Sequence, residues 1–157
     1  MTIRHVRGDL LDQPVEAIVN AWNRNTIPWW LLLPQGVSGA IKRRGGTAPF
    51  IELAKHGRMT LGEAVATEAG RLPFQAIIHV AALTDLWRGS EVAVTEGTRN
   101  AVALAQRHGF RTLAMPLLGA GTGGLSPERV KELITEALNA VDTDIEVTIV
   151  EFERNLH

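Results

Sequence analysis

A strand–loop–helix unit in the second half of the chain constrains the fold most. Residues 112–115 have the apolar pattern of a buried strand, and the loop at 119–124 then holds four glycines in six residues. Ser126 is a good helix N-cap and Pro127 suits the first helical position, so a helix is expected directly after the loop. Such a connection is typical of a sheet that is covered by helices.

The glycine loop is a candidate anion-binding site. Glycine has no Cβ, so its backbone can approach a ligand closely, and successive N–H groups next to a helix N-terminus form a concave donor surface. Each N–H bound to a charged oxygen contributes roughly 1.5–3 kcal/mol, so about three or four of them could hold a phosphate without a lysine. The loop lacks the Gly-Lys-Ser/Thr of a Walker A motif and lies late in the chain for a dinucleotide fingerprint. A strand-to-helix connection without a ligand is the alternative.

The other elements follow from hydrophobic periodicity and turn signals. Further strands are expected at residues 3–6, 15–19, 62–70, 75–82 and 145–152. Helices are expected within 35–46, at 49–56, at 90–108 with Ser90 as its cap, and at 127–140. Because strands and helices alternate through the second half, the sequence predicts an α/β sandwich with a mostly parallel central sheet.

Composition limits the classes of function. The 157 residues, without repeats or low-complexity linkers, predict one domain over residues 1–157. The absence of cysteine excludes disulfides, thiol catalysis and cysteine-ligated metals. The five histidines have no metal-ligand spacing, so no metal or cofactor is expected, and His79, in an apolar strand, should be packed and hydrogen-bonded.

Charge and hydropathy favour a cytoplasmic monomer. The net charge of −1 gives no general attraction to nucleic acids or membranes. The chain has no apolar run near the ~20 residues of a membrane span, and its first residues lack the apolar core of a signal peptide. No membrane contact is therefore expected.

Polar residues follow the predicted strand at 15–19. Asn20, Asn23 and Asn25 fall within six residues, which suits a loop, because asparagine tolerates left-handed backbone and bonds its own chain. Open α/β sheets also bind their ligands at the carboxyl ends of strands, so these residues are candidates for a site. Near the first strand, Asp9 either caps the Gly8-Asp9 turn or accepts a hydrogen bond from a ligand.

The segment 22–44 is unusually apolar and basic. Its run at 29–33 is too short to span a membrane; we expect it in the core, with a lid or contact patch as the alternative. Residues 17–51 contain no acidic residue but include Arg24 and three of the four tryptophans, a pattern compatible with nucleic-acid contact. The simpler interpretation of Lys42, Arg43 and Arg44 is that they offset the negative C-terminal end of a helix.

Taken in order, these pieces resemble the macro domain, an ADP-ribose-binding module. The resemblance covers nearly the whole chain and implies a three-layer α/β/α sandwich with a mixed, mostly parallel sheet. It rests on Gly8-Asp9-Leu10, Ala17-Ile18-Val19-Asn20-Ala21-Trp22-Asn23, Gly36-Val37-Ser38-Gly39-Ala40-Ile41, Gly62-Glu63-Ala64, Leu72-Pro73 before Ile77-Ile78-His79-Val80, the loop from Gly119 to Leu125, and Phe152.

The resemblance also implies a role for each matching residue. Asp9 would accept the adenine amino hydrogen beside the Leu10 backbone, and Phe152 would stack on the adenine, a contact worth ~1–3 kcal/mol at other sites. Asn23 would hydrogen-bond the distal ribose. The implied contacts to the diphosphate and its surroundings involve Asn20, Gly36, Val37, Ser38, Gly119, Ala120, Gly121, Thr122, Gly123 and Gly124.

Two departures from the family pattern bear on catalysis. Hydrolytic members usually carry Val-Asp-Gly after several glycines, and the aspartate helps to place the attacking water; here Ser38 stands in its place. A serine is a poor base without an activator, although some hydrolytic macro domains lack the aspartate and use the diphosphate of the substrate. The insertion at 28–34 would lie beside the distal ribose and select the target.

Two functions follow from the resemblance. The favoured one is hydrolysis of an ADP-ribosyl linkage to a protein carboxylate, a nucleic-acid base or an acetyl group, with Asn23 and Ser38 as candidate catalytic residues. The alternative is a module that binds ADP-ribose or a related nucleotide without chemistry.

Overall fold

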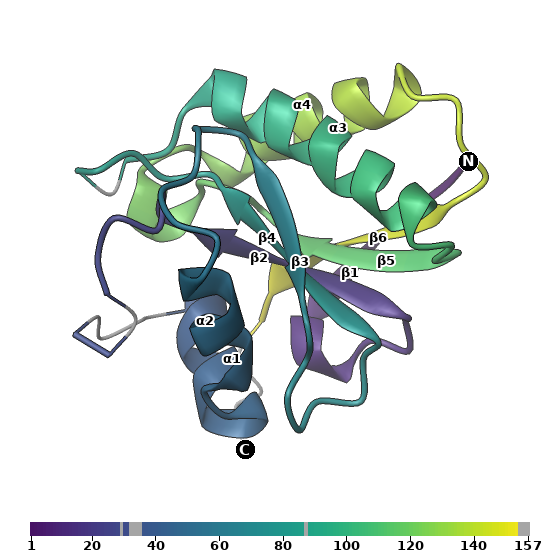
Figure 1. Ribbon diagram of the computed structural model, residues 1–157. Helices are drawn as coiled ribbons and strands as arrows, with labels where there is room; N and C mark the ends of the chain where they lie inside the picture. The colour runs from purple at the N-terminus through teal and green to yellow at the C-terminus, as the bar shows by residue number, and fades with distance from the viewer. Residues whose placement is uncertain (29, 32–35, 87, 154–157) are drawn as a thin grey trace.

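The computed structural model describes residues 1–28, 30–31, 36–86 and 88–153 and shows one twisted sheet between two layers of helices (Figure 1). The sheet has the strand order β1-β6-β5-β2-β4-β3. Only β3 runs antiparallel to its neighbour, which confirms the mixed, mostly parallel sheet. The strands are β1 (Thr2–Gly8), β2 (Ala17–Trp22), β3 (Ala64–Thr67), β4 (Ala76–Ala81), β5 (Thr112–Pro116) and β6 (Glu146–Phe152).

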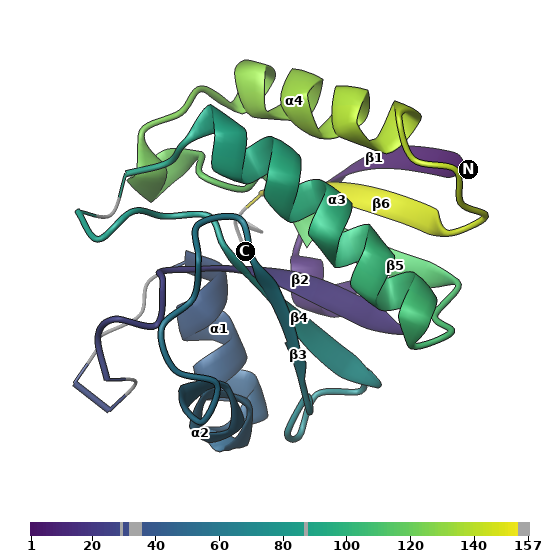
Figure 2. The ribbon, with the colours of Figure 1, turned by 45° about the horizontal axis from the view of Figure 1, so that its top comes forward.

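The described helices divide between the two faces of the sheet (Figures 1 and 2). On one face lie α1 (Gly36–Gly45) and α2 (Ala48–Ala54), and on the other lie α3 (Glu91–Arg107) and α4 (Pro127–Asn139). Two short 3-10 helices, η1 (Leu10–Asp12) and η2 (Gly121–Gly123), lie in connections. The predicted three-layer α/β/α sandwich is confirmed. None of the described helices is long and apolar enough to span a membrane.

Each buried strand supplies side chains to two separate cores, because successive residues of a strand point to opposite faces. In β2, Ala17 and Val19 join the core under α3 and α4, whereas Ile18 and Trp22 join the core above α1 and α2. The Trp22 ring packs on Phe50 of α2, with ring centroids 5.2 Å apart. This two-sided burial explains why β2 and β4 are continuous apolar runs rather than alternating patterns.

The predicted helix caps are confirmed. The Ser90 hydroxyl accepts the N–H of Ala93, and the Ser126 hydroxyl accepts the N–H of Arg129. Pro127 occupies the first helical position of α4. The apolar positions that the helical spacing predicts are buried: Val94, Thr98, Ala101, Val102 and Ala105 in α3, and Val130, Leu133, Ile134, Ala137 and Leu138 in α4. Val141, predicted in the same stripe as the residues of α4, follows the end of the helix and is half-buried.

The parallel pair β2–β5 positions the candidate site. The two strands pair at only two positions, Ala17 with Leu113 and Ile18 with Ala114, so their carboxyl halves run on unpaired with each other. From there the chain leaves β2 for α1 on one face and leaves β5 for α4 on the other. The point where the two connections diverge to opposite faces is a topological switch point, and open α/β sheets bind ligands at such points.

Two expectations about the segment after β2 are wrong. Asn20 lies inside β2, which continues to Trp22, so the loop starts only at Asn23. Trp30 and Leu31, expected in the core, are 67% and 63% exposed. The core on this side is built from other residues, with Trp22 and Phe50 among them. The rest of the apolar run, at 29 and 32–33, lies outside the described residues.

Gly97 provides a test of the packing between α3 and β4. A Cβ at this position would overlap Cγ1 of the buried Val80. Alanine favours a helix over glycine by about 1 kcal/mol, but overpacking a core costs about 1–3 kcal/mol. Gly97→Ala should therefore lower the free energy of unfolding in urea titrations, despite its better helix propensity. Val92→Ala, at an exposed position of the same helix, should change it by at most about 0.5 kcal/mol. Equal or greater stability of Gly97→Ala would contradict this packing.

Candidate functional site

Asp9 and Phe152 lie side by side at the carboxyl ends of β1 and β6. Gly8 is paired with Phe152 in the parallel register, and the N–H of Glu153 donates to the Gly8 carbonyl at 3.1 Å. The Phe152 side chain is 68% exposed at the end of its strand. An exposed aromatic ring next to a carboxylate can stack on a base while the carboxylate accepts an amino hydrogen.

Asp9 also has the structural role that its turn predicted. Its Oδ1 accepts the N–H of Leu11 at 2.9 Å and caps η1, while its Oδ2 lies 3.6 Å from Nη1 of Arg44. The Leu10 side chain is buried, so this residue has only its backbone to offer a ligand. A ligand contact by Asp9 stays a prediction, and it would share the carboxylate with Arg44.

The glycine loop satisfies part of its own hydrogen-bonding capacity. The N–H groups of Ala120, Gly123, Gly124 and Leu125 all donate to carbonyls within residues 117–121. Across the described residues, the N–H groups of Gly119 and Gly121 make no bond to another backbone group. Gly121 has φ +63° and nothing within 4 Å of a Cβ placed on it. Two donors near one open glycine are the kind of backbone groups that bind a phosphate oxygen.

Other glycines of this loop allow close packing against Gly89, a residue that the sequence analysis did not identify. Gly89, in the connection between β4 and α3, donates its N–H to the Gly123 carbonyl at 2.7 Å. A Cβ on Gly89 would lie 2.7 Å from the Gly119 carbonyl oxygen, and a Cβ on Gly123 would lie 3.1 Å from the Gly89 nitrogen. Gly89 therefore packs closely against the glycine loop and hydrogen-bonds it. The one feature of the sequence that could have indicated this residue is its position directly before the Ser90 cap.

Residues Gly36, Val37 and Ser38 form the first turn of α1 rather than a loop. Gly36 is exposed, with φ +61° and nothing within 4 Å of a Cβ placed on it. The Ser38 hydroxyl points toward β2, where it lies 2.8 Å from Oδ1 of Asn20 and 3.2 Å from the Ala21 carbonyl. Ser38 thus ties the helix to the strand.

A row of buried polar side chains continues from Ser38 through the sheet; we call it the polar row, and it consists of Ser38, Asn20, His79 and Thr67. Nδ2 of Asn20 lies 3.1 Å from Nδ1 of His79, and Nε2 of His79 lies 2.8 Å from the Thr67 hydroxyl. All four residues are buried. His79 is packed and hydrogen-bonded, as predicted, and Asn20 could influence a ligand only through its neighbours.

One tautomer of His79 satisfies all of its partners. When the Thr67 hydroxyl donates its single proton to the Glu68 carbonyl, 3.0 Å away, it accepts from Nε2–H of His79. Nδ1 then accepts from Nδ2 of Asn20, whose Oδ1 accepts from Ser38. Burial lowers the pKa of His79 to about 3, so the ring is neutral at physiological pH.

Asn23 is the buried polar residue whose donor has no partner. The residue is 2% exposed and follows directly after β2. Its Oδ1 accepts the N–H of Asn25 at 2.6 Å, which identifies the other end of the amide as Nδ2. Nδ2 is buried and makes no hydrogen bond within the described part of the chain. An unsatisfied buried donor costs about 1–3 kcal/mol, and its position at the switch point indicates an acceptor on a ligand.

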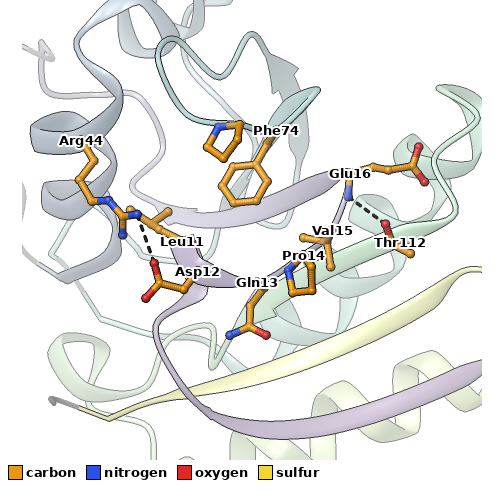
Figure 3. Close-up of a pocket in the computed structure, with 10 residues that line it drawn as sticks. Leu11, Asp12, Gln13, Pro14, Val15, Glu16, Arg44, Phe74 and Thr112 are labelled. Carbon is orange, nitrogen blue, oxygen red and sulfur yellow. Dashed lines mark hydrogen bonds and ion pairs between the residues drawn. The ribbon is translucent and has the colours of Figure 1, made fainter.

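A cavity of about 630 Å³ lies elsewhere, at the amino ends of β2, β4 and β5 (Figure 3). None of the predicted site residues lines it. Its polar groups bond one another: Arg44 pairs with Asp12 at 3.2 Å, and the Thr112 hydroxyl accepts the N–H of Glu16 at 2.8 Å. The predicted site residues instead gather at the opposite, carboxyl ends of the strands.

Cations of the segment 22–44 take part in the fold. Nε of Arg24 donates to the Met59 carbonyl at 3.0 Å, and Arg44 reaches η1 instead of its own helix end. Nucleic-acid contact through this segment stays a prediction. Over the described residues, His, Asp and Glu side chains form no group of three that could hold a metal ion.

The neutral, buried His79 makes stability depend on pH. Between pH 6.5 and about pH 3 the unfolded chain takes up a proton on this ring that the folded chain does not. The free energy of unfolding should therefore fall as pH falls, by about 1.4 kcal/mol per pH unit from this group. Urea titrations of the wild type and of His79→Gln at several pH values measure it. A plot of the free energy of unfolding against pH should be less steep for the variant, by the contribution of one proton. Identical slopes for the two proteins would contradict a neutral, buried His79.

Comparison with known proteins identifies the family and agrees with the fold. A family model described as "Macro domain" matches residues 19–134. An O-acetyl-ADP-ribose deacetylase of Salmonella newport is 32% identical over 143 residues, which cover 85% of this chain and 75% of that protein. Among solved structures, the macrodomain of Thermus aquaticus DarG has a TM-score of 0.76 and 30% identity, covering 98% of this chain and 99% of that one. A Trypanosoma brucei macrodomain in complex with ADP-ribose has a TM-score of 0.79 at 22% identity, covering 97% of this chain and 64% of that one. The chain belongs to the macro domain family.

Proposed function

We propose that this protein binds ADP-ribose along the carboxyl ends of its strands. The adenine stacks on Phe152 beside Asp9, and the diphosphate lies between the glycine loop and the first turn of α1. The distal ribose reaches Asn23. In support, Asp9 and Phe152 are neighbours, the loop retains N–H donors, and a macrodomain with the same fold is solved with ADP-ribose.

The unsatisfied Nδ2 of Asn23 is the observation that supports this proposal most. Asn20, also buried, has protein partners for both ends of its amide, whereas Asn23 has a partner among the described residues only for its oxygen. A ribose hydroxyl supplies the acceptor that Nδ2 lacks. The bound sugar would then recover the free energy that the buried donor costs in the free protein.

We further propose that the protein hydrolyses an ADP-ribosyl linkage. The oxygen of water bonds to the anomeric carbon of the distal ribose, the bond from that carbon to the attached group breaks, and the departing group receives a proton. Asn23 orients the sugar. The Ser38 hydroxyl is directed toward β2, so the diphosphate of the substrate is the better base. A relative named O-acetyl-ADP-ribose deacetylase supports hydrolytic chemistry on ADP-ribose derivatives. For an acetyl ester, water bonds instead to the acetyl carbonyl carbon, the bond from that carbon to the ribose oxygen breaks, and the ribose oxygen receives a proton.

A module that binds ADP-ribose without chemistry is the second candidate. It is favoured by the same orientation of Ser38, which leaves no protein base in the first turn of α1. Assays with an ADP-ribosylated protein, ADP-ribosylated DNA and O-acetyl-ADP-ribose separate the two functions. Release of product from any of them at a rate above that of buffer establishes hydrolysis. Tight binding with no release establishes the binding module.

Replacing Asn23 tests its role at the distal ribose. Asn23→Ala should lower turnover about 2- to 10-fold, because a neutral hydrogen bond of about 0.5–1.5 kcal/mol in the transition state is lost, while most ADP-ribose affinity remains. Single-turnover kinetics and calorimetry measure the two quantities. Asn23→Asp keeps the acceptor for Asn25 but removes the donor, so it should also be slow. Equal losses of affinity and turnover would assign Asn23 to binding alone.

Replacing Gly121 tests the glycine loop. Gly121→Glu should abolish ADP-ribose binding in calorimetry, because a carboxylate would occupy the space of the phosphates and repel them. Gly109→Glu is a matched control, since Gly109 also has a positive φ and nothing within 4 Å of a Cβ placed on it, but follows α3 at the other end of the sheet. The control should bind as the wild type does. Unchanged affinity of Gly121→Glu would remove the loop from the site.

A further inference from the structure

We propose that His79 is a positioning residue, which acts through Asn20 on Ser38 and so orients the first turn of α1. This inference rests on the proposed function, in which that turn contacts the diphosphate and the distal end of ADP-ribose. His79 itself contacts no ligand, because it is fully buried in β4. Its effect reaches the site through the polar row.

The polar row connects three strands and a helix without a break. Asn20 and His79 are direct partners in the β2–β4 register, and Thr67 belongs to β3 on the far side of β4. From Ser38 to Thr67 the successive donor–acceptor distances are 2.8, 3.1 and 2.8 Å. Figure 2 shows β3, β4 and β2 in succession, with α1 against β2. A change at the sheet edge thus has a hydrogen-bonded path to α1.

The direction of every bond in the row depends on the proton of His79. With the proton on Nε2, the Ser38 hydroxyl donates to Oδ1 of Asn20. If the proton were on Nδ1, Asn20 would have to turn its amide, and Nδ2 would donate to Ser38. Ser38 would then direct its proton to the Ala21 carbonyl, at 3.2 Å. The first state is the one in which the Thr67 hydroxyl donates to the Glu68 carbonyl, 3.0 Å away, and accepts from His79.

Stability alone does not require polar groups here. The core around the row contains Ile18, Ile77 and Phe50, and replacing both partners of a buried hydrogen bond by apolar groups of the same shape can be nearly neutral. A fully satisfied polar network instead fixes one arrangement of its members. Because this network ends on Ser38, the arrangement that it fixes is that of the first turn of α1.

Thr67→Val tests the proposal from the end of the row farthest from α1. The valine has the same shape but cannot accept from Nε2–H of His79. ADP-ribose affinity should fall about three- to tenfold in calorimetry, whereas AMP affinity should be unchanged, since AMP ends before the second phosphate. Thr98→Val is the matched control: Thr98 is equally buried, donates to the Val94 carbonyl at 2.7 Å, and lies in the opposite core. The control should bind both nucleotides as the wild type does.

Two further sets of variants test the path. His79→Leu should reproduce the loss seen with Thr67→Val, and His79→Gln should restore part of the affinity, because its amide offers both an acceptor and a donor. Ser38→Ala cuts the row at the helix, so adding Thr67→Val to it should cause no further loss. Additive losses, or equal losses of ADP-ribose and AMP affinity, would overturn the proposal.

A measurement on the free protein separates this inference from the proposed function. In amide NMR spectra without nucleotide, Thr67→Val should shift the resonances of Gly36, Val37 and Ser38, and Thr98→Val should leave them in place. If the wild type fails to bind ADP-ribose while these shifts occur, the proposed ligand is wrong and the row still orients α1. Unshifted resonances in Thr67→Val would refute the role of His79 whatever the ligand.

Discussion

The short pairing between β2 and β5 is the constraint on which the rest of the site depends. Because the strands pair only near Ala17 and Ile18, their carboxyl halves are free to send the chain to opposite faces of the sheet. One exit leads through Asn23 to α1, and the other leads through the glycine loop to α4. The candidate contacts for a diphosphate and a distal ribose are brought together by this divergence, and Asp9 with Phe152 extends them across β6 and β1.

The buried polar groups of the site have two different physical roles. In the polar row each polar side-chain atom has a partner, so the row costs little and favours one arrangement of β2, β4 and α1. Asn23, three residues after Asn20, keeps a buried donor without a partner among the described residues. Such a group lowers the stability of the free protein, and the proposed ligand would supply its missing acceptor. The same residue type is thus structural at Asn20 and a proposed ligand contact at Asn23.

Much of the fold was predictable because its signals are local. The caps Ser90 and Ser126 and the apolar stripe of α4 can be recognised from neighbouring residues alone, and the structure confirms them. The prediction that residues 29–33 enter the core failed for Trp30 and Leu31, because membership of that core, which includes Trp22 and Phe50, depends on contacts across the fold. Gly89 was missed because its purpose, a close approach to Gly119 and Gly123, exists only across the fold.

The sequence by itself determined the layered α/β architecture, which depends on periodicity and capping, and these are properties of adjacent residues. It also predicted an anion at the glycine loop, and its resemblance to the macro domain family implied ADP-ribose as the ligand. Only the tertiary structure decided which loop amides remain as donors, that Asn20 lies in the strand, and that the Ser38 hydroxyl is directed toward β2. It also joined Thr67 and His79 to Ser38, because those bonds link β3, β4 and α1, and no pattern along one segment contains them.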